Sequence, residues 1–332
     1  MSVAADSFVV QIKDLHVEYK TYAGMVKVLN GVNFHVDAGE KVAIVGETGC
    51  GKTTTVKSIL RILPRNSRIP KGEVLFKGEN VLKMTPAQVR ILRGSGVSMI
   101  FQDPTMSLNP VFTIGEQMME VIRNSGSPGA EKREVQQELA VMALRETAMP
   151  DPERIMLSYP FQLSGGMRQR VCIAMSLSTP RDMVIADEPT TNLDVTIQDQ
   201  VLKLLKERVE SKHSSLILIT HSLGVARETS DRIYVMYAGN MVETAPTKEL
   251  FGEQLHPYTQ ALMRCIPRLS GGGVAEGIPG RIPNYLTPPE GCRFAPRCPH
   301  AMERCRSEKP EFIACGNGHM VACFLYDEKG GC

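Results

Sequence analysis

The stretch GETGCGKT, residues 46–53, contains the residue types that bind the phosphates of a nucleotide. It fits the pattern G-x-x-x-x-G-K-[ST] and lies between a predicted strand and a predicted helix, which is the context that the pattern requires. Its glycines let the backbone curl so that N–H groups face phosphate oxygens, and the helix points its positive end at the same oxygens. A glycine-rich turn without a ligand is the weaker interpretation. The predicted nucleotide contacts are Gly46, Thr48, Gly49, Cys50, Gly51, Lys52, Thr53 and Thr54.

Two residues of this loop have a more specific chemistry. Lys52 offers an ammonium group to the β- and γ-phosphates, and the Thr53 hydroxyl can bind Mg²⁺. The sequence therefore predicts ATP and Mg²⁺ as ligands.

An acidic pair, Asp187 and Glu188, ends the apolar run MVIADE at 183–188. Sheet topology can bring the end of such a strand beside the phosphate loop. Asp187 would then hold Mg²⁺, directly or through water, and Glu188 would polarise the attacking water as general base. Taken alone, an ordinary exposed acidic pair is an equal explanation, and the phosphate loop favours the catalytic one.

The segment LSGGMRQR, residues 163–170, predicts a second anion site. Ser164 is a good N-cap, and the two glycines after it expose backbone N–H groups at the start of a helix. A glycine-rich helix start with no ligand is the alternative explanation.

Together these segments resemble the ATP-binding cassette (ABC) ATPases over residues 8–245. The resemblance implies that Gln102, in IFQDP, binds Mg²⁺ and senses the membrane partner. It also implies that Asp194, in TTNLD, lies in the loop that crosses the dimer interface. His221, in LITHS, would contact the γ-phosphate, although alone it would be read as structural. We expect Tyr19 to stack on adenine, with Tyr22 as the competing candidate.

The resemblance further implies a head-to-tail dimer with two sandwiched nucleotides. The phosphate loop of one subunit would face the signature of the other subunit across ATP; the signature residues are Ser164, Gly165, Gly166 and Met167. The chain has one of each element, so it needs a second cassette. Glu188, His221 and Gln102 form the predicted catalytic set, so we expect its own phosphate loop to hydrolyse ATP.

Three longer runs resemble the D-type ATPase of oligopeptide/dipeptide importers: YPFQLSGGMRQRVCIAMSL, FQDPTMSLNPVFTIGEQ and HPYTQALMRCIP. Phe161 departs from the histidine that is common in this branch. The resemblance implies an F-type ATPase or a second copy as partner, two integral membrane permease subunits and an external solute-binding protein. Peptide is the expected solute, with nickel chelates and oligosaccharides as alternatives.

The elements that must position these residues follow from hydrophobic patterning. Short apolar runs at 41–46, 97–102, 183–188 and 215–220 predict buried strands, and 8–20 and 26–40 read as further strands. Helical patterns occupy 53–63, parts of 112–147 and 196–212, and 232–245 reads as a hairpin turning at Gly239-Asn240. This alternation predicts an α/β fold with a mostly parallel sheet. The family resemblance adds a RecA-like P-loop core, an antiparallel β-subdomain and a helical subdomain inserted at about 104–165.

Composition restricts the possible functions. The net charge is +2, from 38 Lys and Arg against 36 Asp and Glu, so charge does not indicate a nucleic-acid partner. The basic run 61–72 reads as a solvated surface. No apolar run approaches the roughly 18 residues of a membrane span, and the N-terminus does not read as a secretory signal. We expect a peripheral protein on the cytoplasmic face of the membrane. A soluble ABC ATPase acting in translation or DNA repair and a nucleotide-binding regulator are the alternatives.

Within the predicted extension 246–332, six of the nine cysteines follow a flexible segment at 269–280. Their spacing lacks the close pairs of structural zinc sites, whereas iron–sulfur clusters accept varied spacing. Zinc, no metal and disulfides remain alternatives. By resemblance to D-type ATPases that hold a [4Fe–4S] cluster, the ligands are Cys292, Cys298, Cys305 and Cys323, with Cys315 as the rival fourth ligand. Cys332 is expected to be free. Cys50, Cys172 and Cys265 are expected to be structural, with Cys50 open to inhibitory thiol reagents.

Overall fold

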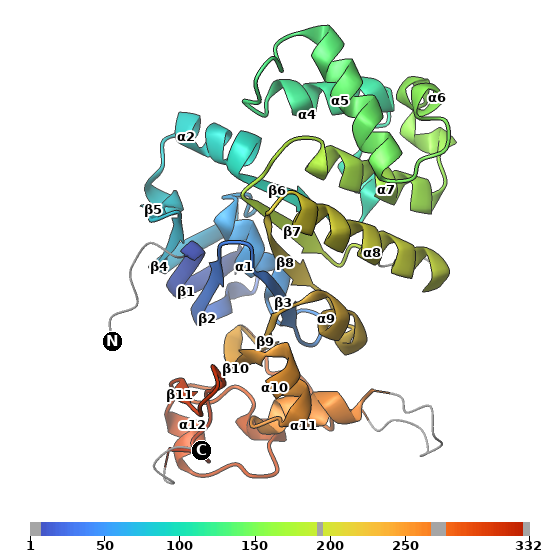
Figure 1. The fold of residues 1–332 in the computed structure, drawn as a ribbon. Coiled ribbons are helices and arrows are strands. Elements are labelled where there is room, and N and C mark those ends of the chain that lie inside the picture. The colour runs from blue at the N-terminus through green and yellow to red at the C-terminus, as the bar shows by residue number, and fades with distance from the viewer. Residues whose placement is uncertain (1–7, 191–194, 267–276, 328–332) are drawn as a thin grey trace. The chain divides into compact units, whose positions relative to one another are not determined.

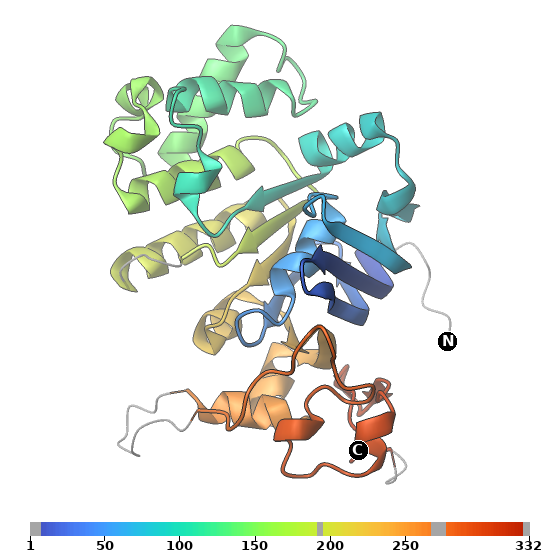
Figure 2. The same ribbon diagram turned by 180° about the vertical axis from the view of Figure 1, so that it is seen from behind.

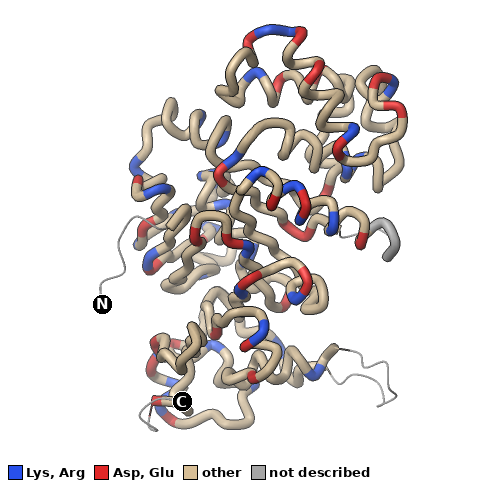
Figure 3. The backbone as a smooth tube through the Cα atoms, viewed as in Figure 1, with Lys and Arg blue, Asp and Glu red and all other residues tan. Residues whose placement is uncertain are grey.

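The computed structural model describes residues 8–190, 195–266 and 277–327 (Figures 1 and 2). Its internal contacts group the chain into two compact units. The first comprises Met1–Val9, Asp37–Glu40 and Lys83–Leu218; the second comprises Val10–Val36, Lys41–Leu82 and Ile219–Cys332. Residues with charges of both signs are interspersed in each unit (Figure 3). Within the described ranges, no helix combines the length and the apolarity needed to cross a membrane.

The first unit contains buried strands in the order β8-β7-β6: Ser215–Ile219, Met183–Asp187 and Val97–Ile100. β6 and β7 are parallel. Every residue of β7 and β8 is buried, which explains their continuous apolar runs. The three predicted strands are confirmed, each one or two residues shorter than the pattern suggested.

Helices make up the rest of the first unit. In chain order they are α2 Pro86–Ile91, the π-helix η2 Leu92–Gly96, α3 Pro104–Ser107, α4 Ile114–Arg123, α5 Arg133–Glu146, α6 Pro152–Leu157, the 3₁₀-helix η3 Pro160–Gln162, α7 Gly165–Leu177 and α8 Val195–Ser211. The helices α4 to α7 lie together (Figure 1), and their shared core includes Ile114, Met118, Ile122 and Leu144. The start of α7, which is the predicted signature segment, belongs to this group of helices.

The second unit contains a four-stranded sheet in the order β2-β1-β4-β5: Gly24–Asp37, Phe8–Thr21, Ser67–Phe76 and Glu79–Asn80. After β5 the 3₁₀-helix η1 spans Val81–Lys83. Strand β4 was not predicted, because its basic, proline-containing start reads as surface. Pro70 is accommodated where the register with β1 shifts, between His16 and Glu18, so its missing N–H interrupts no regular ladder.

A second sheet in this unit has the order β11-β12-β10-β9-β3: Ile313–Ala314, Met320–Val321, Asn240–Pro246, Arg232–Tyr237 and Lys41–Val45. β3 and β9 are parallel, and the other pairs are antiparallel. The predicted turn of the β9–β10 hairpin is one residue too late. Ala238 and Gly239 form the turn with φ of 43° and 80°, and Asn240 pairs with Tyr237. Two positive φ values are what the tight right-twisting turn requires.

The helices of the second unit include α1 Lys52–Ile59, α9 Leu223–Thr229, α10 Thr247–Gly252, α11 Pro257–Arg264, the 3₁₀-helix η4 Ala295–Arg297 and α12 Arg304–Ser307. α1 ends earlier than the predicted 63, since Arg61 adopts a positive φ of 51°.

The cysteine-rich extension shares its hydrophobic core with the strands that carry the phosphate loop. Val45 of β3 and Tyr237 of β9 belong to the same cluster of buried residues as Tyr258 and Phe294. The ring of Tyr237 lies 4.6 Å from that of Tyr258 and 5.1 Å from that of Phe294. The extension also adds β12 to the edge of β10. It is therefore packed into the second unit along much of its described length.

Candidate functional site

The phosphate loop spans the gap between β3, which ends at Val45, and α1, which begins at Lys52. Gly46 has φ of 150°, and a Cβ there would come within 2.1 Å of the Met236 carbonyl oxygen. Gly51, the N-cap of α1, has φ of 111°, and a Cβ there would meet Leu29 at 2.7 Å. Close packing and backbone conformation both require glycine at these two positions.

The Lys52 side chain bonds to the backbone of the phosphate loop. Its side chain is buried, and Nζ donates to the carbonyl oxygens of Gly46 at 2.7 Å and Glu47 at 3.1 Å. The first turn of α1 has no acidic residue, so the positive end of the helix is not neutralised locally. A buried cation, a glycine-rich loop and a helix N-terminus together form an anion site suited to phosphates.

The two candidates for the adenine contact have different surroundings. The Tyr19 hydroxyl lies 3.2 Å from the Thr54 hydroxyl on α1, so its ring stands beside the phosphate loop. Tyr22 is fully exposed. The geometry supports Tyr19 over Tyr22.

His221 follows the carboxyl end of β8. The neighbouring Thr220 N–H donates to the Ile44 carbonyl oxygen at 3.3 Å, so His221 emerges next to β3, the strand that leads to the phosphate loop. Ser222 then caps α9 by accepting from the Val225 N–H. His221 is exposed, as a residue that meets a ligand must be.

In the first unit, Asp187 and Glu188 occupy the end of β7, as predicted. Asp187 is 3 % exposed. Glu188 has φ of 46°, a left-handed conformation that is strained for a non-glycine residue and is common at functional sites. The Gln102 side-chain amide donates to the Glu188 carboxylate at 2.9 Å. The structure therefore brings the predicted base and the predicted glutamine together.

The signature segment begins α7. Ser164 is the N-cap, and its hydroxyl accepts from the Met167 N–H at 3.3 Å. A Cβ added at Gly165 would meet no atom within 4 Å, so the backbone of this turn is open on one side. α7 has no acidic residue in its first turn. These features fit an anion site, with Gly166 inside the same turn. Asp194 lies outside the described residues.

Four cysteines of the extension line one cavity. Its wall includes Cys292, Cys298, Cys305 and Cys323, but not Cys315. Burial, together with a smaller effect of charge on the neighbouring cysteines, raises the pKa of Cys292 to about 11 and that of Cys323 to about 12. The four cysteines therefore border the same space. Cys332 lies outside the described residues.

Cys50 and Cys172 are buried, as expected of structural residues, and Cys265 is half-buried at the end of α11. Burial raises the pKa of the Cys50 thiol. The expectation that thiol reagents attack Cys50 is therefore not supported by its surroundings.

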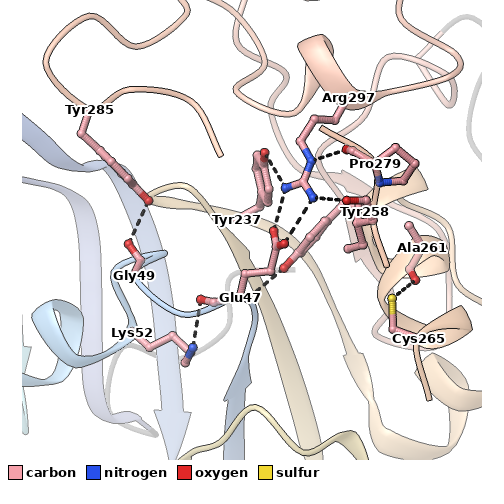
Figure 4. A network of polar contacts seen from close by, with 11 residues as sticks. Glu47, Gly49, Lys52, Tyr237, Tyr258, Ala261, Cys265, Pro279, Tyr285 and Arg297 are labelled. Atoms are coloured by element: carbon pink, nitrogen blue, oxygen red, sulfur yellow. Dashed lines mark hydrogen bonds and ion pairs between the residues drawn. The ribbon is translucent and has the colours of Figure 1, made fainter. Parts of the chain in front are cut away.

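Sequence reasoning missed a group of residues that contact the phosphate loop from the extension (Figure 4). Tyr258 accepts from the Glu47 N–H, Arg297 pairs with the Glu47 carboxylate, and Tyr285 donates to the Gly49 carbonyl oxygen. These residues are 211 to 250 positions away from their loop partners. No local spacing rule could have identified them.

Two family models match the chain. The model described as ABC transporter matches residues 29–191, and the model described as oligopeptide/dipeptide transporter, C-terminal region, matches residues 242–305. The second match overlaps the segment in which Tyr258, Arg297 and the first three cavity cysteines lie.

Relatives match along nearly the whole chain. The dipeptide transport ATP-binding protein DppD of Bacillus subtilis is 43 % identical over 97 % of this chain and 96 % of its own length. The oligopeptide transport ATP-binding protein OppD of Salmonella typhimurium is 43 % identical over 95 % of this chain and 92 % of its own. A probable peptide ABC transporter ATP-binding protein of Sinorhizobium fredii, y4tR, is 44 % identical over 96 % and 95 %.

Solved structures agree on the fold. The ATP-binding cassette MJ0796, in a dimeric post-hydrolysis state bound to ADP and phosphate, matches with a TM-score of 0.65 at 26 % identity. The match covers 72 % of this chain and 98 % of the MJ0796 chain. With the phosphate loop, acidic pair and signature helix already described, these similarities show that the chain is an ATP-hydrolysing member of the ABC transporter ATP-binding protein family, in the branch that carries the oligopeptide/dipeptide transporter C-terminal region.

Proposed function

We propose that this chain powers the import of di- and oligopeptides through an ABC transporter. The observation that carries the proposal is the combination of an intact phosphate loop with a C-terminal region of the oligopeptide/dipeptide type at 242–305. The relatives named for peptide and dipeptide transport span nearly the same length as this chain. No described feature favours a role in translation or DNA repair, or nickel chelates or oligosaccharides as the solute.

Each site residue has a role in the proposed mechanism. The phosphate loop binds the triphosphate, with Lys52 on the β- and γ-phosphates and Tyr19 on the adenine. Glu188 takes the proton of the attacking water, and its hydrogen bond from Gln102 holds the carboxylate in one orientation. His221 contacts the γ-phosphate. Thr53, Gln102 and Asp187 offer the hard oxygen ligands that suit Mg²⁺, which would neutralise charge on the phosphates.

The signature helix indicates a dimer as the working form. Ser164, Gly165, Gly166 and Met167 open α7 as an anion site, separate in sequence from the phosphate loop. In the proposed head-to-tail dimer they meet the ATP of a second cassette, either an F-type subunit or a second copy. Asp194 would act at the same interface. The assembly also contains two integral membrane permease subunits and an external binding protein, and the chain lies peripherally on the cytoplasmic face of the membrane.

We also propose a [4Fe–4S] cluster on Cys292, Cys298, Cys305 and Cys323. All four thiols line one cavity, whereas no three His, Cys, Asp or Glu side chains of the described ranges are placed to hold a single metal ion. A four-iron cluster takes one thiolate at each of four separate irons and needs a wider cage than one zinc ion. The shared cavity supports Cys323 over Cys315 as the fourth ligand. Such a cluster would supply folding energy to the extension.

Uptake measurements test the transport proposal. The chain should co-purify with integral membrane subunits, and vesicles with the complete transporter should accumulate a labelled tripeptide only with ATP. Glu188→Gln should abolish accumulation. Accumulation of a nickel chelate or an oligosaccharide, with none of any peptide, would overturn the peptide assignment.

Elemental analysis tests the cluster. Anaerobically purified chain should contain about four irons and four sulfides with broad visible absorption. Cys323→Ser should lose them, and the matched Cys315→Ser should keep them. Stoichiometric zinc, or iron that survives Cys323→Ser, would contradict the assignment.

A further inference from the structure

The guanidinium of Arg297 donates hydrogen bonds to the phosphate loop and to the chain around it (Figure 4). Nη1 and Nη2 donate to the two carboxylate oxygens of Glu47 at 2.8 and 3.2 Å. Nη1 also donates to the Tyr237 hydroxyl, Nη2 to the Ile278 carbonyl oxygen and Nε to the Pro279 carbonyl oxygen. All five N–H donors of the side chain are thereby used. The Arg297 side chain is only 4 % exposed, so this is a built contact and not a surface ion pair.

Glu47 puts a negative charge into a loop that binds a polyanion. It directly follows Gly46, whose carbonyl oxygen accepts from Lys52 Nζ. An unpaired carboxylate at this position would repel the triphosphate and compete for the same ammonium group. The paired fork of Arg297 neutralises that carboxylate and fixes its direction.

Two tyrosines hold the loop backbone from the same extension. The Glu47 N–H donates to the Tyr258 hydroxyl at 2.9 Å, and the Tyr285 hydroxyl donates to the Gly49 carbonyl oxygen at 2.9 Å. Tyr258 is fully buried and packs against Tyr237. The extension thus fixes both the carboxylate and the backbone of the loop at Glu47 and Gly49.

We propose that Arg297 is a positioning residue for nucleotide binding: the cysteine-rich extension neutralises Glu47 through Arg297, and so keeps the phosphate loop receptive to ATP. Tyr285 assists by fixing Gly49. The inference uses the ATP-binding role of the loop, and is independent of peptide as the solute and of what the four cysteines hold.

The test is a double-mutant cycle read out as the ATP dissociation constant, measured by calorimetry on the full chain. Arg297→Gln should weaken ATP binding about tenfold, the scale of one uncompensated charge at an intermediate dielectric. Glu47→Gln should tighten it, and Glu47→Gln with Arg297→Gln should return to within about threefold of the original chain. Arg297→Lys should lie between the original chain and Arg297→Gln, because it keeps the charge and loses the fork.

Controls and kinetics separate this role from general structural support. Arg68→Gln removes another arginine–glutamate pair of the same unit, with Glu18, and should leave ATP binding unchanged. Tyr285→Phe should weaken binding about threefold, whereas Tyr326→Phe, which loses a comparable bond to the Leu255 carbonyl oxygen, should not. In the assembled transporter, Arg297→Gln should raise KM for ATP and keep kcat.

Three results would overturn the proposal. ATP binding unchanged in Arg297→Gln would overturn the proposal. So would a double variant as weak as Arg297→Gln alone, or a Glu47→Gln variant that is weakened to the same degree, because each would mean that charge neutralisation is not the cause. If Arg297→Gln fails to fold, the opposite effects of Glu47→Gln and Tyr285→Phe carry the test.

Discussion

The side-chain amide of Gln102 donates a hydrogen bond to the carboxylate of Glu188 at 2.9 Å, across 86 positions of the chain. Glu188 itself has a positive φ of 46° directly after the last residue of β7. The strand end and the glutamine together fix where the carboxylate points. A general base needs such a fixed direction, because proton transfer depends on hydrogen-bond geometry.

Replacing Glu188 with glutamine should preserve ATP binding and lower the hydrolysis rate by about 10² to 10⁴, the usual contribution of a general base. Single-turnover measurement of phosphate release from bound ATP checks this prediction. Glu153→Gln, which removes a surface carboxylate paired with Arg145, is the matched control and should hydrolyse at the original rate. Unchanged phosphate release in Glu188→Gln would remove Glu188 from the role of base.

Maleimide labelling should spare Cys50 even though it lies in the phosphate loop. Its side chain is 1 % exposed, and burial raises its pKa, so the reactive thiolate is scarce at neutral pH. Cys265, which is half-buried at the end of α11, should be labelled before Cys50, and labelling of Cys50 should increase as the pH rises. Peptide mass spectrometry after timed labelling checks the order. Earlier labelling of Cys50 would show that the loop opens more readily than its packing indicates.

The stability of the second unit should fall on acidification because of His256. Burial lowers the pKa of His256 to about 4, from an ordinary value of 6.5, while Glu243 acts in the opposite direction. Between these values the unfolded chain binds a proton that the folded chain does not, so stability decreases as the pH falls from 6.5 towards 4, by up to about 1.4 kcal/mol per pH unit.

The matched variant for this pH dependence is His256→Asn. The Nδ1 atom of His256 caps α11 by accepting from the Tyr258 N–H, and asparagine can keep a cap without titrating. Urea unfolding at several pH values should show a shallower pH dependence in the variant. An equal slope in both proteins would assign the acid sensitivity to other groups.

Truncating Phe294 should destabilise the unit that carries the phosphate loop. Phe294 is 2 % exposed and contacts the rings of Tyr237, Tyr258 and His256, so Phe294→Ala should cost about 3 to 5 kcal/mol of unfolding free energy. Phe161→Ala, at a site that is 70 % exposed, should change it by less than about 0.5 kcal/mol. Equal losses would mean that the extension does not share this core.

The sequence was most informative where chemistry depends on local spacing. Gly46 and Gly51 were predictable because a phosphate loop constrains consecutive residues, and the buried strands were predictable because their runs are uniformly apolar. Strand β4 was missed because Pro70 sits at a register shift that only the pairing with β1 reveals. The pairing of Glu47 with Arg297 was missed for a related reason, since 250 positions separate two residues that only tertiary packing brings together.

The contacts of Arg297, Tyr258 and Tyr285 with the phosphate loop also have a consequence for the extension itself. If docking of the extension raises the affinity for ATP by some factor, ATP binding must shift the docking equilibrium of the extension by the same factor, because coupling between two sites is symmetric. For a tenfold factor, the coupling free energy is about 1.4 kcal/mol. Under this coupling, ATP binding would stabilise the docked extension, so a protease would cut the extension more slowly in the ATP-bound chain than in the nucleotide-free chain.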